Sequence, residues 1–262
     1  MTIELTTGDI RVERDFHDTW NEATSIVSTH ELWKDPFMRS LENPEKDPEL
    51  AWLLVTNWAK QMYHGSLAFP RYVGNLVARV NNHAAGRKLS INAAVERGYP
   101  EETRSHFLLA VDLLRSIGMT DEEIVAIPKH PLSSAYIEGH LAYTRDAPLA
   151  KAIGCLGIGI EALTTEEFSF LGNAYVKTAS RVGGIPWHKA YKNQGYFTEN
   201  IMADAQHTTE FEEIAYLTWK SGELPYELDM CMKEISEGAK YSLDLRQKFF
   251  TALHDLAKNR RN

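Results

Sequence analysis

A carboxylate and an imidazole stand three residues apart in the segment Asp204-Ala-Gln-His207. If this segment is helical, the two side chains lie on one face and can reach the same target. Asn200, four residues before Asp204, extends the same stripe. Aspartate and histidine at this spacing suit a divalent metal such as iron. The alternative interpretation is a solvated pair on a polar helix face.

Glu96 and His106 form a second candidate pair, in the segment NAAVERGYPEETRSHF. On one straight helix their ten-residue separation would place them roughly 80° apart. A break at Gly98-Tyr-Pro100 removes that constraint, so Glu96 can end one helix while His106 begins the next. Taken alone, a surface glutamate and a core histidine are also consistent with the sequence.

Glu161 follows a segment, KAIGCLGIGI, in which nine of ten residues are small or apolar. A helix this apolar should be buried, and a lone buried carboxylate costs several kcal/mol unless it is paired, hydrogen-bonded or bound to a metal. We therefore expect Glu161 to point into the protein, within reach of His106, Asp204 or His207. The alternative places this carboxylate at the water-exposed edge of the helix.

Apolar residues recur at helical spacing through almost all of the chain, and alternation of the strand type is nearly absent. Proline and glycine, together with capping residues, mark the helix ends. Short linkers are expected at 183–187 and 221–225. We predict an all-α fold in which residues 1–262 form a single domain of roughly nine or ten helices. The main predicted helices cover residues 13–30, 48–64, a segment opened by Pro70, 89–97, a segment from Pro100 to Gly118, 134–144, 148–163, 166–182, 197–220 and 225–258.

Composition narrows the possible functions of the 262-residue chain, of which 44% is hydrophobic. The formal net charge of -8 argues against binding to nucleic acid and to anionic membranes. The longest apolar stretch, residues 147–163, is too short and too broken by glycine and proline to span a bilayer. The N-terminus lacks a signal-peptide pattern, so we expect a cytoplasmic protein. Cys155 and Cys231 sit in apolar surroundings, and we expect both to be inert core thiols.

The order Glu, His, Glu and then Asp-x-x-His on a late helix resembles the haem-oxygenase-like di-iron oxidases. These belong to a superfamily that also contains TenA, PqqC and the CADD-type oxygenases. The segment from Asn92 to His106 is similar to the first ligand segment, the residues around Glu161 to the middle one, and Tyr196 to His207 to the last. The resemblance covers roughly residues 45–220.

This resemblance implies a haem-oxygenase-like, TenA/PqqC-like helical bundle with metal ligands inside it. On the last helix the family pattern is H-x3-D-x2-H, and Asn200 stands where the first histidine belongs. Asparagine is a weaker ligand for iron than imidazole. The resemblance therefore implies one or two iron ions, or none, and a catalytic role for Glu161. The implied metal ligands are Glu96, His106, Glu161, Asp204 and His207.

The function that the resemblance implies is a metal-dependent oxidase or oxygenase. Its substrates would be O2 and a small organic metabolite, in secondary-metabolite or cofactor biosynthesis, and a homodimer is expected because proteins of this fold often associate. One alternative is a metal-free enzyme like PqqC or TenA. A TenA-like hydrolysis would need a nucleophilic cysteine, and Cys155 lies in a poor place for a reactive thiolate. A second alternative is a non-enzymatic helical binding protein with a degenerate site.

Overall fold

The computed structural model describes residues 7–100 and 104–260 of the chain. Helices make up 81% of the structure, and the described residues contain no strand. The predicted all-α fold is therefore confirmed. Among the described helices, none combines the length and the apolar character needed to cross a membrane.

The helices follow one another through short connections, with a 3-10 turn and a π-helical turn among them. Their bounds in chain order are α1 (Thr7–Thr24), α2 (Ile26–Thr29), the 3-10 turn η1 (Glu31–Lys34), α3 (Pro36–Glu42), α4 (Pro48–Val77), α5 (His83–Val95), α6 (His106–Ser116), α7 (Asp121–Val125), α8 (Pro131–Asp146), α9 (Leu149–Leu156), the π-helical turn η2 (Gly157–Ala162), α10 (Leu163–Ala179), α11 (Trp187–Asn193), α12 (Gly195–Lys220) and α13 (Leu228–Asn259).

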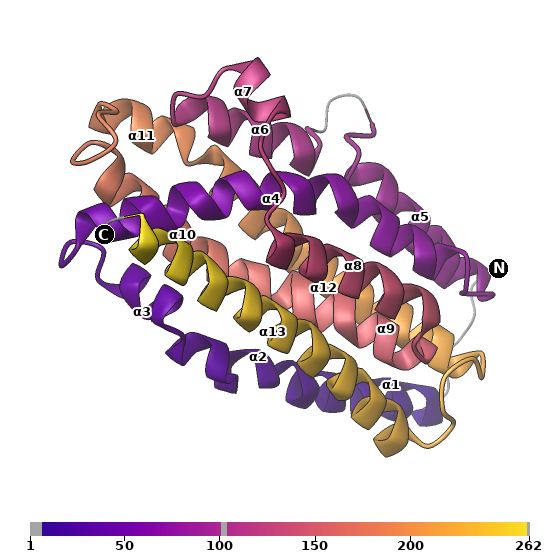
Figure 1. The fold of residues 1–262 in the computed structure, drawn as a ribbon. Helices are drawn as coiled ribbons and strands as arrows, with labels where there is room; N and C mark the ends of the chain where they lie inside the picture. The colour runs from indigo at the N-terminus through magenta and orange to yellow at the C-terminus, as the bar shows by residue number, and fades with distance from the viewer. Residues whose placement is uncertain (1–6, 101–103, 261–262) are drawn as a thin grey trace.

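The long helices lie side by side as a bundle (Figure 1). The last helix, α13, packs against α4, α8 and α9, and also contacts α1 and α3 at the indigo end of the chain. Helix α12 packs against α5, α10 and η2. An apolar stripe on α13 is buried against these neighbours at Met232, Ile235, Ala239, Phe249 and Leu253.

Helix α4 begins as predicted, with the Asp47 carboxylate accepting a hydrogen bond from the Leu50 N–H at 3.1 Å. The prediction that Pro70 opens a separate helix is wrong, because Pro70 lies inside a single helix that continues to Val77. A proline in a helix interior costs about 3 kcal/mol or more. Tyr72 and other apolar side chains on both sides of Pro70 are buried, and this burial outweighs the cost.

The prediction that the next helix starts at Pro100 is also wrong, although residues 101–103 lie outside the described residues. Helix α6 begins at His106, where the Ser105 hydroxyl oxygen accepts a hydrogen bond from the Leu108 N–H at 3.2 Å. Serine is a strong N-cap because this bond satisfies an otherwise free backbone donor. The cap places His106 on the first helical residue, facing the end of α5.

The segment that carries Glu161 is one uninterrupted rod of α9, η2 and α10, rather than the two predicted helices divided near residue 164. Close packing explains its glycines. A Cβ added to Gly154 would lie 2.0 Å from the Ile235 carbonyl oxygen, and one added to Gly159 would lie 2.4 Å from the Ser242 Cβ. The rod can approach α13 so closely only because these positions lack side chains.

Two short helices, α3 and α11, were not predicted, and the helix expected over 13–30 is shorter at its C-terminal end. It starts at Thr7, ends at Thr24, and is separated from α2 by Ser25. Helices this short carry too few periodic residues to stand out in a sequence.

Candidate metal centre

Four segments of the chain, α5, α6, η2 and α12, bring the five predicted ligands together inside the bundle. Glu96 is the C-cap of α5 and His106 is the first residue of α6, the arrangement that a break between them allows. Glu161 lies in the π-helical turn η2, and Asp204 and His207 lie one turn apart on α12. All are buried except the His106 side chain, which is 13% exposed.

Three of these residues surround one point. Ligand atoms of Glu96, Glu161 and His207 all lie within 4.8 Å of one another. The His207 Nδ1 is 3.5 Å from Glu96 Oε1 and 3.6 Å from Glu161 Oε2. These separations exceed a normal hydrogen bond. Oxygen and nitrogen ligands of one ion stand about 2.1 Å from it and therefore about 3 Å from each other.

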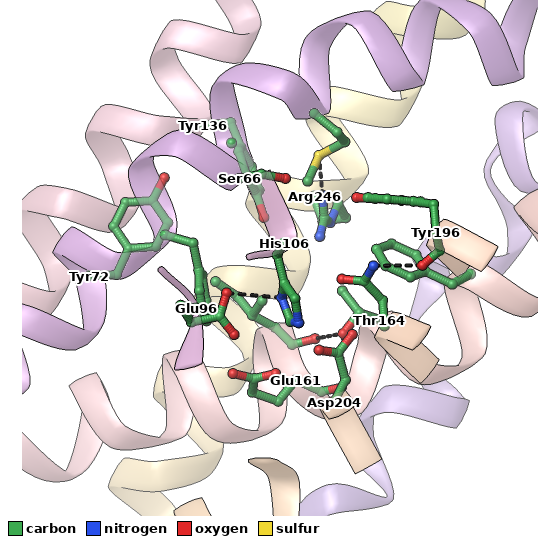
Figure 2. A pocket seen from close by; sticks show the side chains of 16 residues that line it. Ser66, Tyr72, Glu96, His106, Tyr136, Glu161, Thr164, Tyr196, Asp204 and Arg246 are labelled. Atoms are coloured by element: carbon green, nitrogen blue, oxygen red, sulfur yellow. Dashed lines mark hydrogen bonds and ion pairs between the residues drawn. The ribbon is translucent and has the colours of Figure 1, made fainter. Parts of the chain in front are cut away.

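His106 and Asp204 complete the cluster at its edge. The His106 Nδ1 lies 2.9 Å from Glu96 Oε2 (Figure 2), and the His106 and His207 ring centroids are 6.0 Å apart. The Asp204 carboxylate points toward Glu161 and His106 from α12 (Figure 2). The structure thus brings together all five residues expected from the sequence, and their binding of a metal stays a prediction.

Acceptors in this cluster outnumber donors. Glu96 Oε1, Glu161 Oε1, Asp204 Oδ2 and His207 Nδ1 are buried and have no hydrogen-bond partner within the described residues. A buried acceptor that is left without a partner costs about 1–3 kcal/mol, and more if it is charged. Three carboxylates therefore face two imidazoles, and some of the carboxylate oxygens remain available to bind an ion.

The titration of the cluster reflects this excess of negative charge. Burial, reinforced by the charge of Glu161, raises the pKa of Asp204 well above its usual range. Burial alone would lower the pKa of both histidines. The charge of Glu96 raises the pKa of His106 to about 9, and that of Glu161 raises the pKa of His207 to about 10. Protons bound to these groups therefore offset part of the negative charge of the cluster. The carboxylate oxygens and imidazole nitrogens are ligands that fit a divalent iron or manganese ion.

Asn200 lies where the sequence pattern placed it, one turn before Asp204 on α12. It is buried, lines the same pocket as the acids, and its Nδ2 donates a hydrogen bond to the Tyr196 carbonyl oxygen at 2.6 Å. This bond commits the amide nitrogen to the backbone. The carbonyl oxygen of Asn200 is the atom that remains for a ligand.

A cavity of about 50 Å³ lies beside the cluster. Its polar floor is formed by Glu96, His106, Glu161, Asp204 and Asn200, and most of its remaining wall is apolar or aromatic. This volume holds a few water molecules or a small organic group. The apolar part of the wall is formed mainly by Met62, Phe69, Tyr72, Tyr136, Ile160, Phe168 and Tyr196.

A second charged pair, of which Arg246 lines the same pocket, was missed from the sequence. Arg246 and Glu167 are 1% and 0% exposed, and Arg246 Nε lies 3.3 Å from Glu167 Oε2. Trp58 Nε1 donates a hydrogen bond to Glu167 Oε1 at 2.8 Å. A signal was present in the sequence: Arg246 stands on the apolar stripe of α13, between Leu243 and Phe250. A charged residue in such a position needs a buried partner.

Cys155 does not fit a nucleophilic role. Its side chain is fully buried, and burial raises the pKa of its thiol far above the usual range, although a hydrogen bond with Ser242 works in the opposite direction. A reactive cysteine requires a lowered pKa and access to substrate. The expectation of an inert core thiol agrees with this position.

Comparison with solved structures shows the same fold in proteins with little sequence similarity. A CADD-like protein of unknown function from Nostoc punctiforme superposes with a TM-score of 0.69 at 14% identity, covering 93% of this chain and 99% of that chain. A domain of unknown function with a heme oxygenase-like fold, from Shewanella denitrificans, gives a TM-score of 0.62 at 14% identity over 100% and 97% of the two chains. A TenA homolog from Pseudomonas syringae gives 0.58 at 16% identity over 89% and 90%.

No curated protein matches the chain. A family model described as an iron-containing redox enzyme does match, over residues 56–242. The match includes the carboxylates of α5, η2 and α12, their two histidines, and more than half of the chain. This protein therefore belongs to the family of iron-containing redox enzymes, with a haem-oxygenase-like fold.

Proposed function

We propose that the protein is an iron-dependent oxidase or oxygenase that uses O2 to oxidise a small organic molecule. The observation that carries the proposal is the group of three buried carboxylates, Glu96, Glu161 and Asp204, each with an oxygen that has no hydrogen-bond partner within the described residues, beside a cavity. Membership of the family agrees with this chemistry. Carboxylates are hard anionic ligands that suit iron in both oxidation states, and imidazoles add fixed directions.

Each residue of the cluster has a separate role in this proposal. Glu96, Glu161 and His207 hold the first ion, since their ligand atoms already surround one point. His106 and Asp204 bind at the edge or orient the first three. Iron, when bound, would pass electrons from the substrate to O2, so that the substrate is oxidised as O2 is reduced. The aromatic walls keep water from the reacting groups and leave room only for a small substrate.

Asn200 makes the two ion positions unequal. The first position has three strong metal ligands, whereas the second would rely on the carbonyl oxygen of Asn200 in place of an imidazole. We propose that one iron ion binds tightly and that a second binds more weakly. The two can be separated by titration.

The test is to load the metal-free protein with Fe(II) without oxygen, remove free metal, and measure iron per chain. Mn(II) serves as a redox-inert probe for calorimetry. One tight ion, with or without a weaker second one, is the expected result. Loss of binding in His207→Ala would place the ion at the cluster. Failure to bind Fe(II) or Mn(II) would contradict the proposal and favour a metal-free enzyme or a binding protein.

The proposal also covers the oligomeric state of the protein, its partners and its location in the cell. We propose a homodimer without nucleic-acid or membrane partners, acting in the cytoplasm, since the formal charge of -8 disfavours polyanions and anionic bilayers. Light scattering at micromolar concentrations tests the association, and a monomeric mass across that range would contradict it.

A further inference from the structure

The pocket has a second polar region across from the acids. Figure 2 shows Arg246 close to Ser66, Tyr136 and Tyr196 on one side, and the carboxylates on the other, with His106 between them. All of these residues line the same cavity. One side of the cavity therefore presents N–H and O–H groups, and the other side presents carboxylate oxygens.

The Arg246 guanidinium has more donors than acceptors around it. It carries five N–H bonds in a planar fork. Nη1 donates to the thioether sulfur of Met62 at 3.2 Å, and sulfur is a weak acceptor. Nε is 3.3 Å from Glu167 Oε2 but is not aligned for a hydrogen bond. Within the described residues the guanidinium makes no other hydrogen bond, although its side chain is only 1% exposed.

The position of Arg246 is fixed from two directions. Glu167 holds the Nε edge and is itself held by the indole of Trp58. The ring of Tyr136 lies under the guanidinium, 4.9 Å from Cζ to the ring centroid. A guanidinium fixed in this way presents its remaining N–H groups in a constant direction, which lowers the entropy lost on binding a ligand.

Tyr72, which lies beyond Tyr136 and Ser66 from Arg246 in Figure 2, gives an independent indication in the same cavity. Its side chain lines the cavity and is 1% exposed, and its hydroxyl has no hydrogen-bond partner within the described residues. Burial raises the pKa of Tyr72 well above its usual range, so the hydroxyl stays protonated and can donate. A buried hydroxyl without a partner points to an acceptor that the protein itself does not supply.

We propose that Arg246 and Tyr72 form the binding site for a carboxylate group on the substrate. A carboxylate is planar, carries two acceptor oxygens, and matches the fork of a guanidinium. The cavity volume of about 50 Å³ limits the rest of the molecule to a small acid. That the far end of the acid faces Glu96 and Glu161, where it would be oxidised, rests on the proposed function.

The test compares propanoate with propanamide in ligand-observed NMR titrations of the metal-free and the Mn(II)-loaded protein. The acid should bind at least about tenfold more tightly than the amide, because hydrogen bonds to charged groups contribute more than neutral ones. Arg246→Gln should raise the Kd of propanoate by at least about tenfold, and Tyr72→Phe by about threefold. Arg115→Gln is the matched control, because that exposed arginine pairs with Asp121 on the surface.

Arg246→Gln leaves Glu167 buried without its cation, and this variant can lose stability. The double variant Glu167→Gln/Arg246→Gln removes both charges, and Tyr72→Phe removes only a hydroxyl without a partner. Circular dichroism verifies that each variant is folded. If propanoate binds equally well to the double variant, to Tyr72→Phe and to the natural chain, the proposed carboxylate site is wrong.

The same titrations distinguish binding of the acid to Arg246 from binding of the acid to the metal ion. An acid that binds directly to the ion would require Mn(II), would be lost in His207→Ala, and would ignore Arg246→Gln, and that result overturns the carboxylate site. Loss of propanoate binding in Arg246→Gln with unchanged Mn(II) binding supports it. Propanoate binding that depends on Arg246 in a protein unable to bind iron would keep the carboxylate site and reject the iron-dependent oxidase.

Discussion

Glu161 and Glu167 lie six residues apart on one continuous helical rod, and both are almost completely buried. Their surroundings differ in kind. Glu167 has the guanidinium of Arg246 and the indole N–H of Trp58. Glu161 lies among Glu96 and other acidic groups, and the imidazole of His207 is 3.6 Å from it. One oxygen of Glu161 and one of Glu167 have no hydrogen-bond partner among the described residues, so the difference lies in the charges that surround them. The charge of Glu167 is compensated by the fold, whereas that of Glu161 is compensated only in part.

This difference shows that burial of an acid does not by itself indicate a functional site. A buried pair can be part of the scaffold, and its net contribution to stability is small. A buried group of acids that exceeds the available cations indicates that something else must bind there. The four predictions below test this contrast by substitution and by pH.

The largest effect is expected from Glu167→Gln. Removing one partner of a buried ion pair should lower the free energy of unfolding by about 3–5 kcal/mol, because Arg246 is then left without its counter-charge. The loss should be equal with and without Mn(II). Urea denaturation measures it, and Glu166→Gln, an exposed neighbour, should stay within about 0.5 kcal/mol of the natural chain. A tolerated Glu167→Gln would show that the pair contributes nothing.

The same substitution at Glu161 should change the stability of the metal-free protein much less. It relieves the crowding of three buried acids but also removes the charge that raises the pKa of His207, so the free energy of unfolding should stay within about 1 kcal/mol of that of the natural chain. Mn(II) affinity should fall at least about 100-fold, since even residues that only support ligands cost about 10–100-fold. Denaturation and calorimetry with Glu166→Gln as control provide the measurement. A destabilised metal-free protein that keeps its Mn(II) affinity would place Glu161 in the scaffold beside Glu167.

Asn200→His should strengthen the second ion position. Imidazole is a better donor than a carboxamide, so the weaker Mn(II) site should tighten by about tenfold, or 1.4 kcal/mol. Gln206→His is the control, because it adds an imidazole to the exposed face of the same helix. Calorimetry compares the two variants. Equal Mn(II) binding by both would show that Asn200 does not face a metal position.

The smallest effect concerns pH. The pKa of His207 is raised to about 10 in the metal-free protein, so its proton stabilises the fold fully below about 6.5, its unfolded pKa, and this contribution is lost as the pH rises through about 10. A metal ion must displace that proton. Mn(II) affinity should therefore increase from pH 6 toward pH 9, with about one proton released per ion from His207.

Calorimetry of the natural chain in two buffers of different ionisation enthalpy counts these protons. No proton release is expected from Arg246 or Glu167, because neither is a proposed ligand of the ion. Mn(II) binding without proton release would mean that the histidines are not ligands.

The sequence alone was sufficient for the fold class and for the choice of candidate ligands. Helical periodicity does not depend on tertiary contacts, and the apolar segment before Glu161 already required that residue to be buried. The break between Glu96 and His106 was also visible, since glycine and proline interrupt helices locally. Boundaries were less predictable. The burial that overrides Pro70 depends on neighbours that the local pattern does not show. The Ser105 cap that starts α6 is a local signal, and it competed with the helix start expected at Pro100.

Only the tertiary structure decided which charges are compensated. Glu161 and Glu167 are both buried acids on one rod in the structure, and the difference between them comes from α13, which brings Arg246 to one and not to the other. The pairing of Arg246 with an acid some eighty residues earlier has no local signal, because it depends on how the helices pack. A sequence lists the charged groups, whereas their balance in a low-dielectric interior is set by distances that exist only after folding.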